Sequence, residues 1–415
     1  MTIDQPGRDE LAALDAADPL APFRTRFALP DGVIYLDGNS LGPLPRATAA
    51  RVAEVIEAEW GRSLIGGWIR HGWMAAPRRV GDKIARLIGA APGEVIVADS
   101  TSVNLFKALA AALELRPGRR TILTQQGNFP TDRYVADGLA RLLGEGRRVR
   151  AVPADGLVGA LDADTAVLML THVDYRTGAM HDLAGLTAAA HRAGALVIWD
   201  LAHSAGAVPV DLAAAGADLA VGCGYKYLNG GPGAPAFLHV AARHQDRLNP
   251  PIAGWLGHAR PFDFAETYEP APGIQRHLGG TPVVLGLAAL EIGVDLMAEA
   301  DPVALRAKSV ALGQSFIALT EARCAGLGLA LVSPRDPVRR GSQVGFAHPE
   351  GYAVMQALIA RGVIGDFRAP DILRFGMTPL YLRHVDVWDA VEALRDVLAT
   401  RAWDRPEYRT RAAVT

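Results

Sequence analysis

The sequence predicts an α/β protein with a large domain built on a mainly parallel sheet between helices, followed by a smaller α+β domain. Three observations support this prediction. Apolar runs of strand length alternate with helical patterns as far as about residue 282, and polar side chains follow several of these runs. After about residue 283 the chain changes to two long helical patterns followed by short strands. Alternating strands and helices are typical of a mainly parallel sheet with both faces covered.

The expected elements of the large domain follow in chain order. We expect an N-terminal arm over residues 1–30 and the large domain over residues 31–282. Its strands are predicted near 33–36, 95–98, 121–124, 167–170, 195–199 and 219–221, and its helices near 46–60, 100–114, 130–143 and 183–193.

A smaller domain is expected over residues 283–400, with a polar and loosely held tail over 401–415. Its helices are predicted near 283–297, 302–323, 351–361 and 385–399, and its strands near 329–332, 344–347, 363–367 and 372–375.

Composition narrows the class of protein. The 415 residues are 50% hydrophobic and 21% charged, and 42 basic side chains stand against 44 acidic ones, for a net charge of -2. This balance gives no reason to expect nucleic acid or an anionic membrane as a partner. The two cysteines, Cys223 and Cys324, cannot form a disulfide framework or a thiolate metal cluster, so no metal site is expected. With no secretory leader and no long apolar stretch in the sequence, a cytoplasmic enzyme is the expectation.

Lys226 is the first candidate catalytic residue. It stands between Tyr225 and Tyr227, after an apolar run and before a turn rich in glycine. Burial between aromatic rings favours a neutral, nucleophilic amine of the kind that forms an imine. A lysine in this setting can also extend its amine to solvent or pair with a carboxylate.

Asp200 ends the apolar run at 195–199, and His203 follows three residues later. Ligands bind at the carboxyl ends of strands in α/β sheets. A carboxylate at this position suits pyridoxal 5'-phosphate, whose ring nitrogen must stay protonated to draw electrons from a substrate carbanion. His203 could stack on the ring or bond its phenolic oxygen. For Asp200 alone, a helix cap is the alternative.

Two further strand ends carry candidate cofactor contacts. Thr101 and Ser102 open a helix after a strand, where free N–H groups and the helix dipole attract a phosphate, although hydroxyls there are also ordinary caps. Phe129 could cover one face of a cofactor ring while Asp132 reaches its edge. Core packing and a helix cap are the alternatives for these two residues.

The N-terminal part holds candidate substrate contacts. Asn39 and Ser40 lie in a tight turn after the strand at 33–36, where a turn role alone is equally consistent. Trp68 lies in a glycine-rich loop with Trp73, and large aromatic side chains in such a loop indicate a pocket or a subunit interface.

Five motifs together resemble the kynureninase family, over roughly residues 30–400. They are LDGNSLG at 36–42, FPTD at 129–132, DLAH at 200–203, YKYLN at 225–229 and GWLGH at 254–258. The resemblance implies the aspartate aminotransferase-like fold, in which the mainly parallel sheet of the large domain is of the seven-stranded type. It also implies hydrolysis of L-kynurenine to anthranilate and L-alanine with pyridoxal 5'-phosphate, in tryptophan catabolism. It also implies a homodimer with active sites at the subunit interface.

Position by position, the resemblance implies that Lys226 carries the cofactor and moves a proton, assisted by Tyr225, while Asp132 helps to hydrate the substrate carbonyl. The implied cofactor contacts are Thr101, Ser102, Phe129, Pro130, Thr131, Asp132, Thr171, Asp200, His203, Tyr225, Lys226, Trp255 and Thr281, of which Trp255 and Thr281 would reach across the dimer. The implied substrate contacts are Arg374, Asn39, Ser40, Trp68 and Gly280.

Arg374 would bind the substrate α-carboxylate, for which a guanidinium is well suited, while Arg276 and Arg368 compete for this role. Thr281 and Gly280, with Trp68, resemble bacterial members, which favour L-kynurenine over its 3-hydroxy derivative. Two alternatives stay open: a cysteine desulfurase or aminotransferase of the same fold, and a binding protein without activity. A desulfurase needs a reactive loop cysteine, and the positions of Cys223 and Cys324 argue against it.

Overall fold

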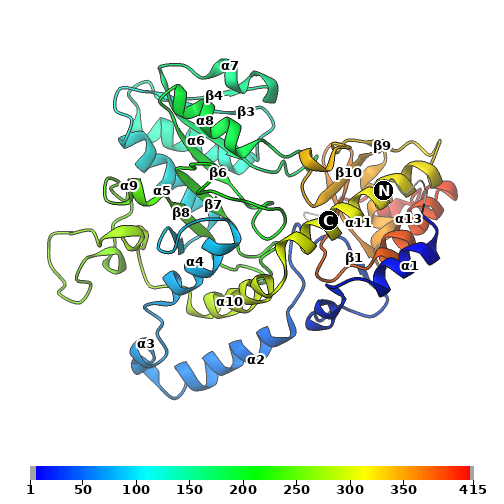
Figure 1. Ribbon diagram of the computed structural model, residues 1–415, viewed down its shortest axis with the longest axis horizontal. Coiled ribbons are helices and arrows are strands. Elements are labelled where there is room, and N and C mark those ends of the chain that lie inside the picture. Colours follow the sequence, from blue (N-terminus) through cyan, green and yellow to red (C-terminus); the bar gives the residue numbers. More distant parts are fainter. Residues whose placement is uncertain (1–5, 412–415) are drawn as a thin grey trace. The chain divides into compact units, whose positions relative to one another are not determined.

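The structure is a computed structural model that describes residues 6–411. The chain forms two compact units (Figure 1). The large unit comprises Thr48–His172 and His181–Ala298. The small unit comprises the described parts of Met1–Ala47 and Glu299–Thr415, together with Val173–Met180. The domain boundaries expected after residues 30 and 282 remain a prediction, and the two units divide the chain at other points.

The large unit is built on the expected seven-stranded sheet, in the order β2-β8-β7-β6-β5-β3-β4. Neighbouring strands from β4 to β7 are parallel, whereas β8 runs antiparallel to β7 and β2. The sheet is therefore mainly parallel, as the sequence predicted. The strands are β2 (Val95–Val97), β3 (Thr121–Gln125), β4 (Arg148–Val152), β5 (Thr165–Thr171), β6 (Leu196–Asp200), β7 (Leu219–Gly222) and β8 (Phe237–Val240).

Helices cover both faces of this sheet because successive side chains of a strand point to opposite faces. In β6, Val197 and Trp199 pack with α4, α8 and α10, whereas Leu196 and Ile198 pack with α5 and α6. The helices along this part of the chain are α2 (Arg46–Glu54), α3 (Gly67–Arg70), α4 (Ala76–Leu87), α5 (Thr101–Glu114), α6 (Pro130–Leu143), α7 (Leu157–Ala160), α8 (Leu183–Arg192), α9 (Ala242–Gln245) and α10 (Val284–Glu299).

The small unit contains both the first and the last segments of the described chain. Its antiparallel sheet has the order β12-β13-β10-β9, and β1 pairs in parallel with β11. The strands are β1 (Ile34–Tyr35), β9 (Ala330–Leu331), β10 (Gln343–Ala347), β11 (Val363–Ile364), β12 (Asp366–Arg368) and β13 (Ile372–Gly376). The helices are α1 (Arg8–Ala16), α11 (Pro302–Arg323), α12 (Gly351–Ile359), α13 (His384–Ala399) and α14 (Pro406–Arg409).

Several elements differ from the sequence prediction. The strands β4 and β8 and the helix α4 were not predicted, and the strand expected over 363–367 is divided into β11 and β12. The tail also makes contacts as far as it is described: the Tyr352 hydroxyl donates to the Thr410 carbonyl oxygen at 3.1 Å. No helix among residues 6–411 is long and apolar enough to cross a membrane.

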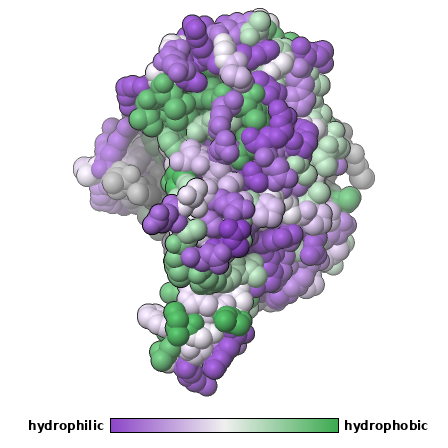
Figure 2. Space-filling model, turned by 90° about the vertical axis from the view of Figure 1, so that its left-hand side faces the viewer, coloured by the Kyte–Doolittle hydropathy of each residue, from purple (hydrophilic) through white to green (hydrophobic). Residues whose placement is uncertain are grey.

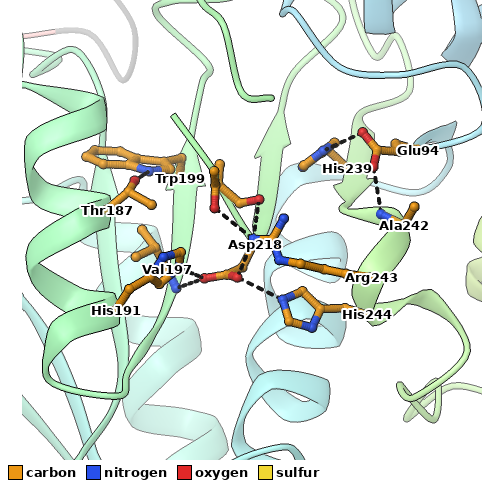
Figure 3. Close-up of polar contacts among 12 residues, drawn as sticks. Glu94, Thr187, His191, Val197, Trp199, Asp218, His239, Ala242, Arg243 and His244 are labelled. Carbon is orange, nitrogen blue, oxygen red and sulfur yellow. Dashed lines mark hydrogen bonds and ion pairs between the residues drawn. The ribbon is translucent and has the colours of Figure 1, made fainter. Parts of the chain in front are cut away.

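The buried carboxylate of Asp218, just before β7, bonds residues of β6, α8 and α9 (Figure 3). Asp218 accepts hydrogen bonds from the backbone N–H of Val197 at 2.9 Å, from His191 Nε2 and His244 Nε2 at 2.8 Å each, and from Arg243 Nη2 at 2.6 Å. These bonds, His244 first among them, hold the pKa of Asp218 well below its usual range despite burial. Asp218 precedes β7, so this network lies at the sheet edge opposite to the carboxyl ends of the parallel strands.

Candidate active site

Lys226 lies in a turn that begins four residues after β7 ends. Its Nζ is 3.1 Å from Nε2 of His203, 5.9 Å from the ring centre of Phe129 and 5.8 Å from that of Tyr225. The turn is held by backbone bonds, since Asn229 donates to the Lys226 carbonyl oxygen at 3.0 Å. The structure therefore brings together four residues that the sequence had assigned to one site.

Two buried carboxylates stand at the same edge of the sheet. Asp200 ends β6 and accepts a hydrogen bond from the Ala202 N–H at 2.8 Å, and no helix follows that it could cap. Burial raises the pKa of both Asp200 and Asp132, and the negative charge of Asp200 raises that of Asp132 further. Lys226 acts in the opposite direction on both carboxyls. This environment favours a protonated carboxyl, or a ligand that brings a positive charge.

Asn128 is a member of this site that sequence reasoning missed. Its Oδ1 accepts from the Thr171 N–H at 2.9 Å, and its Nδ2 donates to Asp132 Oδ2 at 3.2 Å. The Thr171 hydroxyl also donates to Asp132 Oδ2, at 3.4 Å. Asp132 thus serves these contacts and does not cap α6. The only signal for Asn128 was its place next to Phe129 in the motif.

The start of α5 borders a cavity of about 300 Å³. Its lining includes Thr101 and Tyr225, while Ser102 is the second residue of the helix. The first N–H groups of an α-helix have no partner within the helix, so they can bind an anion. Asp99 also lines this cavity, and its carboxylate pairs with the buried amine of Lys107.

A second polar cluster surrounds Arg374 on β13 of the small unit. Asp366 of β12 accepts from Arg374 Nε at 2.8 Å and also from Nη2. Ser40 Oγ accepts from Nη2 at 2.7 Å, and the Tyr175 carbonyl oxygen accepts from Nη1. Arg368 donates to Ser40 at 3.1 Å and to Asp366 at 2.6 Å, so both arginines are held by the same side chains.

Asn39 and Arg276, the remaining candidates for substrate binding, differ in their hydrogen bonds. Asn39 is fully buried, and neither polar atom of its amide has a hydrogen-bond partner among the described residues. By contrast, Arg276 of the large unit donates to Asp246 at 2.8 Å and to the carbonyl oxygens of Ala271 at 3.1 Å and Leu248 at 3.2 Å. Arg276 therefore has a structural role, and Arg374 and Arg368 remain the candidates for a carboxylate ligand.

Known proteins with similar sequences decide the family. The chain is 59% identical to the kynureninase of Burkholderia pseudomallei (strain 1106a), across 98% of this chain and 99% of that one. It is 54% identical to the kynureninase of Pseudomonas fluorescens, with the same coverage. The chain belongs to the kynureninase family. The family model described as "Kynureninase C-terminal domain" matches residues 305–394.

Solved structures confirm the fold class predicted for this kynureninase family member. The cysteine desulfurase CsdA of Escherichia coli superposes with a TM-score of 0.77 at 21% identity, covering 92% of this chain and 98% of that one. At this identity the likeness concerns the aspartate aminotransferase-like fold alone. Both cysteines are buried here, and burial raises the pKa of each, that of Cys324 to about 11. Neither is the exposed, acidic thiol that a desulfurase needs.

Four residues assigned from the kynureninase resemblance lie apart from the Lys226 turn in sequence and make other contacts. The rings of Trp68 and Trp255 meet edge to face, with centres 5.9 Å apart. Gly280 and Thr281 are exposed in the segment before α10. Among the described residues, no hydrogen bond joins Thr281 or Gly280 to Lys226. Their roles remain predictions, as do those of Pro130 and Thr131 in the first turn of α6.

Proposed function

We propose that this protein hydrolyses L-kynurenine to anthranilate and L-alanine with pyridoxal 5'-phosphate, as an enzyme of tryptophan catabolism. The similarity to kynureninases along nearly the whole chain is the observation that carries this proposal. A cytoplasmic location is part of it, since a chain with two unpaired cysteines suits a reducing compartment.

The residues present fit the cofactor. Asp200 and Asp132 are buried carboxyls whose pKa values are raised by burial, so a ligand with a basic ring nitrogen supplies the positive charge that their site lacks. The cavity at the start of α5 offers hydroxyl and N–H donors to a phosphate. When bound, pyridoxal 5'-phosphate supplies an electron sink for the negative charge that develops at the substrate Cα.

The proposed roles in the large unit follow from these contacts. Lys226 Nζ carries the cofactor and moves the proton of the substrate Cα, and His203, 3.1 Å away, orients the amine. Burial and the charge of Asp200 raise the pKa of Asp132, which favours its protonated form, and a protonated Asp132 can donate to the substrate carbonyl when water adds. Tyr225 assists the proton transfer and borders the phosphate cavity.

In the small unit, Arg374 is proposed to bind the substrate α-carboxylate. The contacts of Arg374 with Asp366 and Ser40 fix the guanidinium before the substrate arrives, so little side-chain entropy is lost on binding. Neither polar atom of the Asn39 amide has a hydrogen-bond partner among the described residues, and we propose that this amide bonds the substrate. The resemblance assigns Trp68 and Gly280 to the substrate as well.

We further propose a homodimer with active sites at the subunit interface. Large apolar side chains are exposed around α3, and Figure 2 shows apolar surface at the bottom of the view, at the height of α3 in Figure 1. Leu64 is 65% exposed, Ile65 is 82% exposed and Ile69 is 90% exposed. A cluster of this kind is typical of a surface that a partner covers. In the dimer, Trp255 and Thr281 would contact the cofactor bound to the other chain.

Purified protein with added cofactor and L-kynurenine tests the main proposal. Anthranilate and alanine are expected in equal amounts, together with the visible absorbance of bound cofactor. Lys226→Ala should abolish both products, whereas Lys83→Ala, which removes an amine paired with Glu291 at 2.8 Å, should retain them. A cofactor spectrum without anthranilate would reject the proposed substrate and keep the fold.

Mixing two inactive variants tests the shared site. If one active site uses Lys226 of one chain and Trp255 of the other, a heterodimer of Lys226→Ala with Trp255→Ala has one intact site. Activity should then return on mixing and subunit exchange, to about a quarter of the wild-type value for random pairing. Lys226→Ala refolded alone is the control. Monomers in light scattering, or no recovery of activity after exchange, would contradict the shared site.

A further inference from the structure

Asp37 follows β1 and meets the Arg374 cluster with a second carboxyl group. The backbone around it is fixed on two sides, since Leu36 donates to the Ile364 carbonyl oxygen at 2.6 Å and accepts from the Gly376 N–H at 2.6 Å. The Asp37 carboxyl interacts with both Ser40 and Asp366. Its Oδ1 is buried and has no hydrogen-bond partner among residues 6–411. A buried carboxylate oxygen without a donor is costly, whereas a protonated carboxyl fits this place.

Arg374 has one donor left for a ligand. A guanidinium has five N–H groups. Nε and one N–H of Nη2 bond Asp366, the second N–H of Nη2 bonds Ser40, and Nη1 bonds the Tyr175 carbonyl oxygen. The second N–H of Nη1 has no partner among the described residues. An anion bound there experiences the summed charge of the whole cluster.

That charge depends on one proton. Arg374 and Arg368 contribute two positive charges and Asp366 one negative charge, so the cluster carries one net positive charge while Asp37 is protonated. When Asp37 ionises, the net charge is zero and the attraction for an anion is lost. Charged or titratable groups from several elements face this pair: Tyr35 of β1, Asp366 and Arg368 of β12, Arg374 of β13, Tyr175 of Val173–Met180, and Tyr381 next to Gly38.

We propose that Asp37 and Asp366 together hold one proton beside Arg374, and that loss of this proton weakens binding of the substrate carboxylate. Asp37 is then a positioning residue that acts through Arg374, and it makes substrate affinity depend on pH in the neutral range. This inference rests on the proposed function, in which Arg374 binds the α-carboxylate. It also agrees with the chemistry of the pair, because burial and the charge of Asp366 raise the pKa of Asp37 to about 7.

The sign of the effect follows from the direction of this shift. Below pH 7 Asp37 is neutral and the anion binds well; above pH 7 Asp37 is ionised and binding weakens. A group that titrates at about 7 is about one-tenth ionised at pH 6 and about nine-tenths ionised at pH 8. If the neutral form alone binds, the KM for L-kynurenine rises about tenfold between these two values.

The test is the pH profile of KM for the wild-type holoenzyme and for Asp37→Asn. The variant keeps the size of the side chain and cannot ionise, so its KM should stay low and change less than about twofold between pH 6 and pH 8. Asp366→Asn is a second variant, in which Asp37 loses its negative neighbour and pairs with Arg374. The cluster then keeps one net positive charge at both pH values, so the KM of this variant should also stay flat. Asp31→Asn removes an exposed carboxylate of the small unit and should keep the wild-type slope.

A second measurement does not depend on turnover. L-Alanine carries the same α-carboxylate, and its binding to the holoenzyme is followed by the change in visible absorbance. Its dissociation constant should rise with pH in the wild type and not in Asp37→Asn. A slope in Asp37→Asn equal to that of the wild type, for either ligand, overturns the inference, as does a flat wild-type profile. Failure of the proposed function gives a different result: the wild type then releases no anthranilate. The pH dependence of L-alanine binding still tests the role of Asp37 in that case.

Discussion

Replacement of Asp218 by asparagine is expected to destabilise the large unit strongly. The change removes a negative charge from a buried network and keeps the size of the side chain. Asp218 is 1% exposed and accepts four hydrogen bonds, whereas the amide of asparagine has one acceptor oxygen, and its NH₂ group would face donors. At least two of the present donors lose their partner.

The magnitude follows from the exposure of each partner. The side chains of Arg243 and His191 are 48% and 38% exposed, so hydrogen bonds to water can replace much of the bond that each loses with Asp218. His244 is 7% exposed, and the Val197 N–H lies within the buried strand β6, so water cannot replace the acceptor that these two donors lose. A hydrogen bond to a charged group contributes about 1.5–3 kcal/mol, and leaving one of these two donors unpaired costs about 1–3 kcal/mol. We therefore expect a loss of about 3 kcal/mol in the free energy of unfolding.

Urea denaturation of the cofactor-free protein, followed by circular dichroism, measures this loss. The difference between wild type and Asp218→Asn should be constant from pH 8 to about pH 5 and shrink below about pH 4, the ordinary range of an unfolded aspartate. The sign is that of a depressed pKa: the stabilisation exists above the unfolded value and is lost as pH falls towards the folded one. Asp155→Asn, at an exposed position, is the control, with a change below about 0.5 kcal/mol. A loss below about 1 kcal/mol in Asp218→Asn would refute the reasoning.

Three further changes test the site. Asn128→Ala leaves the buried N–H of Thr171 unpaired and should lower kcat more than tenfold while lowering the thermal midpoint; wild-type kcat would contradict the role of the amide. Lys107→Met removes the cation that pairs with the carboxylate lining the α5 cavity, so the cofactor dissociation constant in a fluorescence titration should rise about tenfold, and unchanged affinity would count against a phosphate there. Gly376→Ala places a methyl group on Oδ1 of Asn39 and should raise KM with little change in kcat, and an unchanged KM would exclude Asn39 from substrate binding.

The sequence was most informative about elements whose side chains face the core on both sides. The strands β5, β6 and β7 are buried throughout, so each reads as an apolar run; β5 ends in the polar Thr171 and β6 in Asp200. The strand β4 is an edge strand with Arg148 and Arg150 at alternate positions and partly exposed side chains, and this pattern resembles a loop. The strand β8 is only four residues long and contains His239, which hides its apolar character.

The residues of the candidate site also differ in how far the sequence alone could reveal them. Lys226, Asp200 and His203 could be found because each follows a recognisable strand within a few residues. Asn128 and Asp366 could not, because their roles come from partners distant in the chain: Asn128 bonds Thr171, and Asp366 bonds Arg374 and Ser40. Such pairings arise from the fold, and no local pattern of residue types signals them.

The pairing of β1 with β11 has a consequence for the order in which the protein is made. The small unit contains both ends of the described chain, since Ile34 lies in register with Val363 and the amine of Lys308 bonds Asp18 at 2.6 Å. The ribosome must therefore release the chain beyond Val363 before β1 can pair with β11. The large unit has its core strands between Val95 and Val240 and can form earlier. During synthesis the N-terminal segment therefore stays unpaired until β11 has been made. A truncation that removes β11 would leave β1 without its partner strand.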